Sequence, residues 1–381
     1  MKKNILILPT DYPNIYNDHT AIFVEDQARA LAKHEDVDVS VIGAIPISFK
    51  DIWKKKIFKF GYFEYKKHDL NVTLLLFPSI PKLKSFNNFI RYVLNKKLIG
   101  QYSKLSRIDL IHVHNSVAGE AALWSKENHN IPYCVTEHSS RFAKGLVTKK
   151  ELNEYVKVYN NSSYNIAVSQ EFCDLLENIY NLRFYYVPNV VDTNFFKPKI
   201  DSKNIFTFIN VGYLDINKNQ TNLIKAFSKA FKDNENVNLL ILGNGSEYEN
   251  LKKEIEINGM QKQITLYGFA TRDEVLKELQ GSDAFVLSSD YETFGVVLIE
   301  AMSCGLPVVA TKCGGPESII IDKKLGVLTN KSVKALADGM RHIYETVYNS
   351  TEIREHIVKN FSEKIVAERL INIYKIVLNE S

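Results

Sequence analysis

The sequence contains little cysteine and no long hydrophobic run. Its 381 residues include four cysteines and no C-x-x-C pair, which excludes a small disulfide scaffold and disfavours structural zinc. No apolar stretch approaches the ~20 residues that cross a bilayer. The run Ile5–Pro9 is also shorter than the ~7–15 apolar residues of a secretory signal. We therefore expect a cytoplasmic chain whose cysteines are buried free thiols, namely Cys134, Cys173, Cys304 and Cys313.

Net charge is also scarce, but it is unevenly distributed. The formal charge is +4, from 48 basic and 44 acidic residues, which indicates no nucleic-acid partner. Residues 50–107, however, hold fourteen Lys or Arg and three Asp or Glu. This concentration of positive charge predicts a surface that meets something anionic.

The remaining composition is that of an ordinary globular protein, and the length predicts two domains. Short apolar runs alternate with helical stretches such as Phe23–Lys33, which is typical of parallel sheets covered by helices. Two successive sets of these units predict an α/β protein with two Rossmann-like domains. The expected strands are Asn4–Leu8, Val37–Ile42, Val72–Phe77, Asp109–Val113, Tyr133–Thr136, Tyr164–Val168, Phe184–Val187, Phe206–Val211, Leu239–Gly243, Ile264–Tyr267, Ala284–Ser288 and Pro307–Ala310.

The domain boundary is expected near Val187–Pro198, where two prolines bracket a run that is ill suited to a helix. We therefore place an N-terminal domain at residues 1–190 and a C-terminal domain at 200–354. The chain reads as helix beyond Lys331, and we expect its last helix, about 355–381, to pack back on the N-terminal domain.

The most specific stretch lies between Ser288 and Ala310. Glu292 follows a strand, and Glu300 lies among apolar neighbours, about two turns into a helix expected to begin near Thr293–Phe294. A buried carboxylate needs hydrogen-bond donors, and ligand hydroxyls can supply them. The helix N-terminus can seat a phosphate. A structural role is the better interpretation of Glu300 alone, but the pair of glutamates at this spacing favours a function.

This stretch resembles the glycosyltransferases of family 4, which adopt the GT-B fold. The specific part is Glu292 and Glu300 with seven residues between them, followed by Ala301–Ala310 and Gly314–Glu317. The resemblance covers most of the chain. Supporting matches are Val187–Asp192, like the family's "PNGVD" turn with Val190 in place of glycine; Thr136–Ser140, like its histidine loop; and Asp109–His114, like its "D-x-I-H-x-H" strand.

The resemblance implies two Rossmann-like domains facing a central cleft, the N-terminal one for the acceptor and the C-terminal one for the donor. It implies transfer of a sugar from a UDP- or GDP-sugar with retention of configuration, without a metal or other cofactor. Glu292 would contact the donor sugar and Glu300 the ribose hydroxyls. Backbone N–H groups of Thr293, Phe294 and Gly295 would meet the diphosphate or the sugar.

The phosphate-binding loops match the family's pattern at Lys218 and depart from it at two other positions. Lys218 matches a lysine that can neutralise the leaving diphosphate, although an exposed lysine at a helix start is the alternative. Tyr213 stands where the family usually has an arginine, and Ala21 where a glycine lets the backbone approach the diphosphate. We include both as candidate donor-binding residues.

Histidines follow several of the predicted strands. His138 lies just past a strand, where open α/β sheets bind ligands, and the resemblance puts it beside the donor sugar. The neighbouring Glu137 is expected to be structural. His114 is equally compatible with lining the site and with packing, whereas His19 is expected to be an exposed loop residue.

Other enzyme classes share this architecture. A non-hydrolysing nucleotide-sugar epimerase would need no acceptor, and a non-catalytic nucleotide-sugar-binding subunit is compatible with Tyr213 and Ala21. A dinucleotide oxidoreductase is disfavoured because no G-x-G-x-x-G follows the first strand.

The basic segment 50–107 interleaves cations with large apolar side chains, for example Lys54–Lys56 beside Trp53, and Arg91 beside Phe86 and Phe89. A solvated helix face is the alternative, but cations beside aromatics suit an anionic membrane surface. We therefore expect a peripheral protein on the inner face of the plasma membrane that acts on a lipid-linked acceptor. Its role would be the synthesis of a cell-surface glycan such as lipopolysaccharide or capsule.

Overall fold

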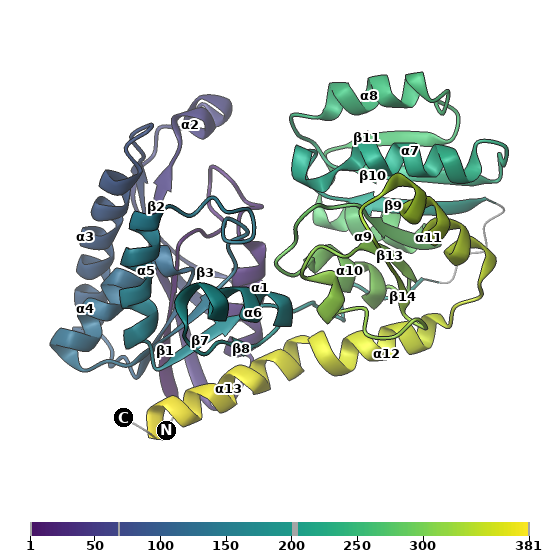
Figure 1. The fold of residues 1–381 in the computed structure, drawn as a ribbon. Helices are drawn as coiled ribbons and strands as arrows, with labels where there is room; N and C mark the ends of the chain where they lie inside the picture. Colours follow the sequence, from purple (N-terminus) through teal and green to yellow (C-terminus); the bar gives the residue numbers. More distant parts are fainter. Residues whose placement is uncertain (1, 68, 200–204, 380–381) are drawn as a thin grey trace. The chain divides into compact units, whose positions relative to one another are not determined.

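The computed structural model describes residues 2–67, 69–199 and 205–379. The chain divides into two compact units (Figure 1). The first unit runs to Val190 and resumes at Glu363, and the second lies between Val191 and Ser362. Each is built on one sheet, so the predicted pair of Rossmann-like domains is confirmed.

The sheet of the first unit has eight strands within the described residues, in the order β3-β4-β2-β1-β5-β6-β7-β8. Adjacent strands of this sheet are parallel, except that β3 is antiparallel to β4. The last five residues of β1 are all buried, as expected for a strand covered on both faces. The strands are β1 (Lys3–Pro9), β2 (Val37–Ile47), β3 (Gly61–Lys67), β4 (Leu70–Pro78), β5 (Leu110–His114), β6 (Tyr133–Glu137), β7 (Tyr164–Ala167) and β8 (Tyr185–Tyr186).

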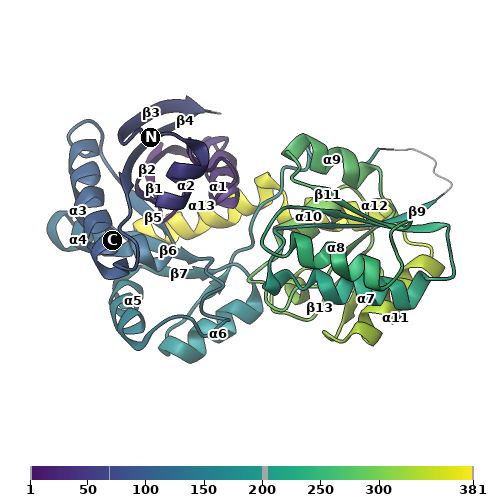
Figure 2. The same cartoon turned by 90° about the horizontal axis from the view of Figure 1, so that it is seen from above.

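Helices cover both faces of this sheet. In Figures 1 and 2, α3 and α4 lie on one side of it, and α1 and α13 on the other. The helix α5 begins with a capping box in which the side chains of Thr148 and Glu151 each bond the other residue's backbone. The helices are α1 (Ile22–Ala32), α2 (Phe49–Lys55), α3 (Lys84–Tyr102), α4 (Gly119–His129), α5 (Lys149–Asn161), α6 (Gln170–Tyr180) and α13 (Glu363–Asn379), with the 3-10 turn η1 (Ser116–Ala118).

The helix α13 completes the core of the first unit although it comes last in the chain. Its buried side chains, among them Leu370 and Tyr374, pack with those of β1 and α1. Arg29 of α1 and Lys33, which follows that helix, both pair with Glu363, at 3.1 and 2.6 Å. The last helix therefore belongs to the N-terminal fold.

The sheet of the second unit is parallel, with the order β11-β10-β9-β12-β13-β14 in the described part of the chain. Figure 2 shows α7, α8 and α11 on one side of this sheet and α9 on the other. The strands are β9 (Phe206–Val211), β10 (Val237–Leu242), β11 (Ile264–Gly268), β12 (Ala284–Leu287), β13 (Val308–Thr311) and β14 (Gly326–Thr329). The helices are α7 (Gln220–Phe231), α8 (Tyr248–Ile257), α9 (Arg272–Gln280), α10 (Val296–Ser303), α11 (Val333–Glu345) and α12 (Ser350–Phe361), with the 3-10 turns η2 (Ile216–Lys218) and η3 (Pro316–Ser318).

The chain returns to the first unit at Glu363, later than the predicted residue 355. The helix α12 stays in the second unit because Ile353 and Ile357 are fully buried there and α12 packs against α10. The Phe361 ring also lies 5.9 Å from that of Phe294. Apolar packing thus fixes which helix belongs to which unit.

Candidate functional site

The carboxyl ends of β9 and β12 bring Lys218 and Glu292 together. Lys218 Nζ lies 2.6 Å from Glu292 Oε1, and the Ser289 hydroxyl donates to the same oxygen at 2.7 Å. Burial alone would lower the pKa of Lys218, but the charge and hydrogen bond of Glu292 outweigh it, so the pKa is raised. The ammonium group is therefore charged at neutral pH.

The lysine is fixed by its own turn and by the neighbouring loop. The Asp215 carboxylate accepts from the Lys218 backbone N–H at 3.0 Å and caps η2. The Ser288 hydroxyl, just past β12, donates to the Lys218 carbonyl oxygen at 2.8 Å. Lys218 is thus not the simple exposed lysine that was the alternative interpretation.

Glu292 is held through its backbone by the glycine-rich segment after β13. Its N–H donates to the Cys313 carbonyl oxygen at 3.0 Å, and its own carbonyl oxygen accepts from the Gly315 N–H at 2.8 Å. A Cβ at Gly315 would lie 2.1 Å from the Phe294 carbonyl oxygen. Only glycine allows this approach, which explains the glycine-rich part of the motif.

The helix after Glu292 begins later than predicted. Gly295 has φ +99° and stands at the N-cap, so α10 starts at Val296 instead of near Thr293–Phe294. Glu300 is therefore about one turn into the helix, where it is partly buried. The left-handed backbone at Gly295, which favours glycine, is what delays the start of the helix.

Two other predicted donor-binding residues, Phe294 and Tyr213, offer a ligand only part of what their positions suggest. The Phe294 side chain is buried, so that only its backbone can meet a ligand. Tyr213, at the position where an arginine is usual, is 61% exposed. It carries no charge and cannot replace the missing cation electrostatically.

Three histidines gather at the carboxyl ends of β5 and β6 in the first unit. His114 Nδ1 lies 3.0 Å from His138 Nε2. His112 hydrogen-bonds the Tyr374 hydroxyl at 2.6 Å and the Thr136 hydroxyl at 2.7 Å. His112 therefore ties β5 to the last helix, and His114 holds the imidazole of His138.

All three imidazoles are neutral at physiological pH. Burial lowers the pKa of His112 to about 3. Burial, and repulsion from His112 when that imidazole is protonated, lower the pKa of His138 to about 3, against the opposing effect of the Asn189 side chain. The pKa of His114 is also lowered well below its usual value, mainly by burial. His138 can thus exchange hydrogen bonds with a hydroxyl but does not supply a positive charge.

Glu137 is structural, as expected. It is fully buried, and its Oε2 atom accepts from the Ser116 N–H at 3.0 Å, the Ser116 hydroxyl at 2.9 Å and the Tyr159 hydroxyl at 2.6 Å. His19 is exposed and lies 3.5 Å from Asp18, as expected for a loop histidine. The four cysteines are buried free thiols, as predicted.

Ala21 has a left-handed backbone conformation at the start of α1. It is the N-cap residue of α1, with φ 49° and ψ 36°. This left-handed region favours glycine, and an alanine there is strained. The Ala21 backbone is thus in a region that glycine adopts without strain, and its methyl group occupies the space beside the backbone.

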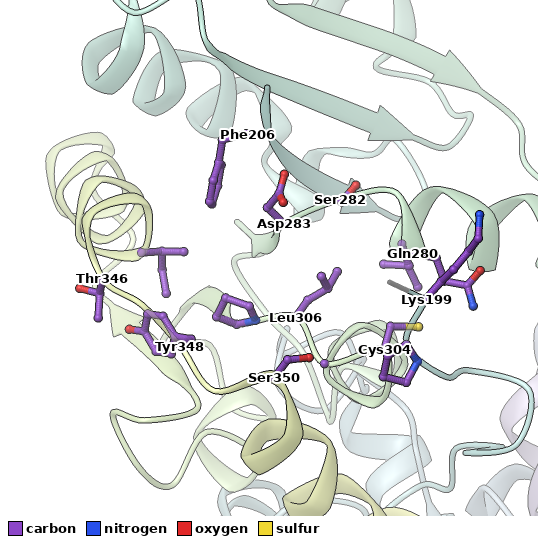
Figure 3. Close-up of a pocket in the computed structure, with 15 residues that line it drawn as sticks. Lys199, Phe206, Gln280, Ser282, Asp283, Cys304, Leu306, Thr346, Tyr348 and Ser350 are labelled. Carbon is purple, nitrogen blue, oxygen red and sulfur yellow. The ribbon is translucent and has the colours of Figure 1, made fainter. Parts of the chain in front are cut away.

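The second unit also has a hollow of about 360 Å³, which lies at the opposite edge of its sheet (Figure 3). Its walls include Phe206 at the start of β9, Asp283 before β12, Pro307 before β13, and Tyr348. Because Lys218 and Glu292 follow the other ends of these strands, this hollow is separate from the candidate site. Among the described residues no group of three or more His, Cys, Asp and Glu side chains is arranged to hold a metal ion.

Two family models match the chain. The model of the glycosyl transferases group 1 matches residues 190–363, and that of Glycosyltransferase Family 4 matches residues 20–195. A probable sucrose-phosphate synthase of Thermosipho melanesiensis is 26% identical over 390 residues, covering 92% of this chain and 89% of its own. An alpha-monoglucosyldiacylglycerol synthase of Acholeplasma laidlawii is 24% identical over 333 residues, covering 77% and 81%.

The solved structures show the same fold. The crystal structure of Anabaena HepE in complex with UDP superposes with a TM-score of 0.76 at 19% identity, covering 99% of this chain and all of that one. Two Rossmann-like units of this kind define a GT-B protein. The chain belongs to glycosyltransferase family 4, and the resemblance seen in the sequence is confirmed.

Proposed function

We propose that the chain is a retaining glycosyltransferase that moves a sugar from a UDP- or GDP-sugar to a glycan acceptor. The observation that carries this proposal is the Lys218–Glu292 pair at the carboxyl ends of β9 and β12, where open α/β sheets bind their ligands. The UDP bound to Anabaena HepE supports a nucleotide-sugar donor.

Each candidate residue has a role in this reaction. Lys218 neutralises the charge that develops on the leaving diphosphate. Glu292 binds the transferred sugar, and Glu300 accepts hydrogen bonds from the ribose hydroxyls. Backbone N–H groups at Thr293 and Gly295 donate to the diphosphate or the sugar.

In the first unit, His138 bonds a hydroxyl of the transferred sugar, and the neutral imidazole allows it either to donate or to accept. The backbone at Ala21 approaches the diphosphate. The N-terminal unit binds the acceptor.

The test of the proposal is binding followed by transfer. A panel of UDP- and GDP-sugars should include at least one that raises the melting temperature of the full chain, because a ligand of the native state stabilises it by mass action. That donor should then be consumed only with an acceptor, and the product should keep the donor's anomeric configuration by NMR. A panel without any stabilising nucleotide-sugar would contradict the proposal.

We expect transfer to be independent of metal ions. The Lys218 ammonium group is charged, and Glu292 is its ionic partner. The lysine side chain can turn from Glu292 towards a bound diphosphate and neutralise its charge without a bridging metal ion. Activity should survive an excess of EDTA. Loss of activity that magnesium or manganese restores would show that a metal carries the diphosphate instead.

The Glu300→Gln variant should bind the donor about 10- to 150-fold more weakly, since a hydrogen bond to a charged group contributes about 1.5–3 kcal/mol. Affinity for the free nucleotide should fall equally, because the ribose belongs to it. Glu317→Gln is a matched control for the fold, because Glu317 accepts the Gly314 N–H at 3.0 Å in the neighbouring loop. Unchanged nucleotide affinity in a folded Glu300→Gln protein would remove the ribose role.

The acceptor is proposed to be lipid-linked and to be reached from an anionic membrane surface on the cytoplasmic side. The name of the Acholeplasma relative describes a product built on diacylglycerol, which supports a lipid acceptor. Exposed cations and aromatics also gather at one edge of the first sheet. We define the basic–aromatic surface as the exposed side chains of Trp53, Lys54, Lys55, Lys56, Phe58, Lys59, Lys82, Leu83, Phe86 and Phe89.

The two halves of this surface come together because β2 and β4 are paired. Ile47 lies opposite Pro78, and the Ser79 N–H donates to the Ile47 carbonyl oxygen at 2.8 Å. The residues that follow both strands therefore leave the same edge of the sheet. Trp53 is 72% exposed, as suits a side chain that enters a headgroup region. None of the helices in the described ranges has the length and apolarity needed to cross a bilayer.

Tyr213 supports a second candidate function, a nucleotide-sugar-binding subunit without turnover. An exposed tyrosine in place of the expected arginine leaves Lys218 as the cation at this loop. Transfer to any acceptor would exclude this candidate. Reversible epimerisation of the donor without an acceptor would instead identify an epimerase.

A further inference from the structure

The loops after β1 and β5 meet where the strand order of the first sheet reverses. β1 lies between β2 and β5, so the chain leaves β1 to one side and returns at β5 on the other. Open α/β sheets bind ligands outside the carboxyl ends of the strands at such a switch point. Pro9 and His114 are the last paired residues of the two strands, and the Thr10 hydroxyl donates to the Asn115 carbonyl oxygen at 3.4 Å. Thr10 and Asn115 therefore stand together at the switch point.

Asn115 has an uncommon backbone conformation. Its φ is 69° and its ψ is 131°, which lies outside the left-handed helical region that Asn130 and Asn181 occupy. Such a conformation is strained for a residue with a Cβ, and it persists only where neighbouring groups hold it. The Asn115 N–H donates to the Thr136 carbonyl oxygen at 2.9 Å, and the Asn115 carbonyl oxygen accepts from the Ala118 N–H at 3.1 Å. The fold thus holds Asn115 in place at a cost in stability.

The side-chain amide of Asn115 has a fixed orientation. Its Oδ1 atom accepts from the His138 backbone N–H at 2.9 Å. A backbone N–H can only donate, so the amide oxygen must face His138 and the amide nitrogen must point elsewhere. Asn115 Nδ2 bonds no group within the described ranges, and it is not one of the fully buried atoms that lack a partner. Because the side chain is partly buried, Nδ2 is a firmly held donor that is open to solvent.

The polar residues that hydrogen-bond to Asn115 carry no charge at neutral pH. Thr10 and Thr136 are not ionisable, and burial lowers the pKa of His138 to about 3. His114, which bonds His138 at 3.0 Å, is neutral for the same reason, because burial holds its pKa well below the usual value. An ionised ligand group would need a partner of opposite charge. This set of amide, hydroxyl and imidazole groups therefore suits a neutral sugar.

We propose that Asn115 Nδ2 donates a hydrogen bond to a hydroxyl oxygen of a neutral sugar in the acceptor. This inference rests on the proposed glycosyl transfer and names the group of the acceptor that the first unit recognises. Asn115 Oδ1 also holds the backbone of His138, which is proposed to bond the transferred sugar, so one side chain serves both substrates. The strain at Asn115 places the amide donor directly beyond the end of β5.

The test measures hexose binding to the full chain in the presence of UDP or GDP, whichever the chain binds. By saturation-transfer NMR, at least one of glucose, galactose, mannose and N-acetylglucosamine should bind. One monodeoxy analogue of that hexose should bind about 3- to 10-fold more weakly, because a neutral hydrogen bond is lost. The Asn115→Gly variant removes the amide and tolerates this backbone, and it should bind the parent hexose and that analogue equally weakly. Two changes that remove the same contact do not add.

Two controls separate a direct contact from a change in the fold. Asn130→Gly alters another asparagine with positive φ, at the C-cap of α4, and should leave hexose affinity unchanged. Affinity for the nucleoside diphosphate, which reports on the donor, should be unchanged in both glycine variants.

Asn115→Asp provides a variant that preserves the support of the loop. It keeps an oxygen that accepts the His138 N–H, but it replaces the amide nitrogen by a second oxygen. A fluorine in place of the contacted hydroxyl can accept a hydrogen bond but cannot donate one. The deoxyfluoro analogue should therefore bind this variant about ten-fold more weakly than it binds the natural chain, because its fluorine meets an oxygen instead of a donor.

The inference is overturned if no hexose binds in the presence of the nucleotide, if the losses from Asn115→Gly and from deoxygenation add, or if Asn115→Asp binds the deoxyfluoro analogue as well as the natural chain does. It is also overturned if Glu292→Gln abolishes hexose binding and Asn115→Gly does not, since the hexose then occupies the place of the transferred sugar. A chain that binds nucleotide-sugars but no hexose loses only this inference, whereas a chain that binds no nucleotide-sugar loses the proposed function.

Discussion

Replacing Lys218 with glutamine should lower the turnover number by about 10²- to 10³-fold, the usual effect of removing one group that stabilises a developing anion. The ammonium nitrogen of Lys218 lies 2.6 Å from Glu292 Oε1 and is the cation paired with this carboxylate among the described residues. Donor binding should weaken less than turnover, because the charge on the leaving diphosphate grows towards the transition state. Initial rates over a range of donor concentrations separate the two effects.

A conservative change and a matched control sharpen this result. Lys218→Arg keeps the charge and should recover part of the rate. Lys225→Gln removes a more exposed lysine of the same unit, 3.8 Å from Glu254, and should leave the rate unchanged. Because Lys218 and Glu292 are in contact, losses from Lys218→Gln and Glu292→Gln should not add in the double variant. Full turnover in Lys218→Gln would exclude diphosphate stabilisation by this residue.

The second large effect concerns the basic–aromatic surface. Changing Lys54, Lys55 and Lys56 together to Glu should release the protein from anionic vesicles and lower the partition coefficient by more than 100-fold. Each lysine near such a surface contributes about 1 kcal/mol, and reversal replaces attraction by repulsion. Sedimentation with phosphatidylglycerol vesicles measures the partitioning. Donor affinity should not change, because these lysines belong to the other unit.

The matched control carries the same change in net charge elsewhere. Lys252, Lys253 and Lys262 are exposed in the second unit, and their replacement by Glu should leave vesicle binding nearly intact. Binding of the natural chain should fall as salt rises, since the screening length is ~8 Å at physiological ionic strength and shorter above it. Equal binding to neutral vesicles, or none at low salt, would rule out the membrane surface.

The alternation of apolar runs was sufficient to predict the parallel strands of both sheets except β14, because a strand buried on two faces must be apolar along its length. The short strand β14, which pairs in parallel with β13, was not predicted. The edge strand β3 was not predicted. Most of its side chains are exposed, including those of Glu64, Lys66 and Lys67. Such a strand is stabilised by its hydrogen bonds to β4, and the hydrophobicity of its own residues does not identify that partner.

The candidate site was predictable where a motif fixes the local backbone. Glu292, Gly315 and Lys218 could be named because their motifs resemble those of the family, but the ion pair between Lys218 and Glu292 joins residues 74 positions apart. Arg91 shows the opposite limit. The sequence suggested that it lies at the membrane surface, which is wrong because its side chain is 6% exposed. In sequence it is one of fourteen cations in a basic segment, and only the packing of α3 against η1 distinguishes it from its solvated neighbours.

The placement of α13 has a consequence for biosynthesis. The N-terminal unit lacks Leu370 and Tyr374, and with them one wall of its core, until α13 has left the ribosome. The second unit lies between Val191 and Ser362 without such an interruption and can close while translation continues. During that interval an apolar face of the first unit stays uncovered, so this unit finishes folding after the second unit although most of it precedes the second unit in the chain.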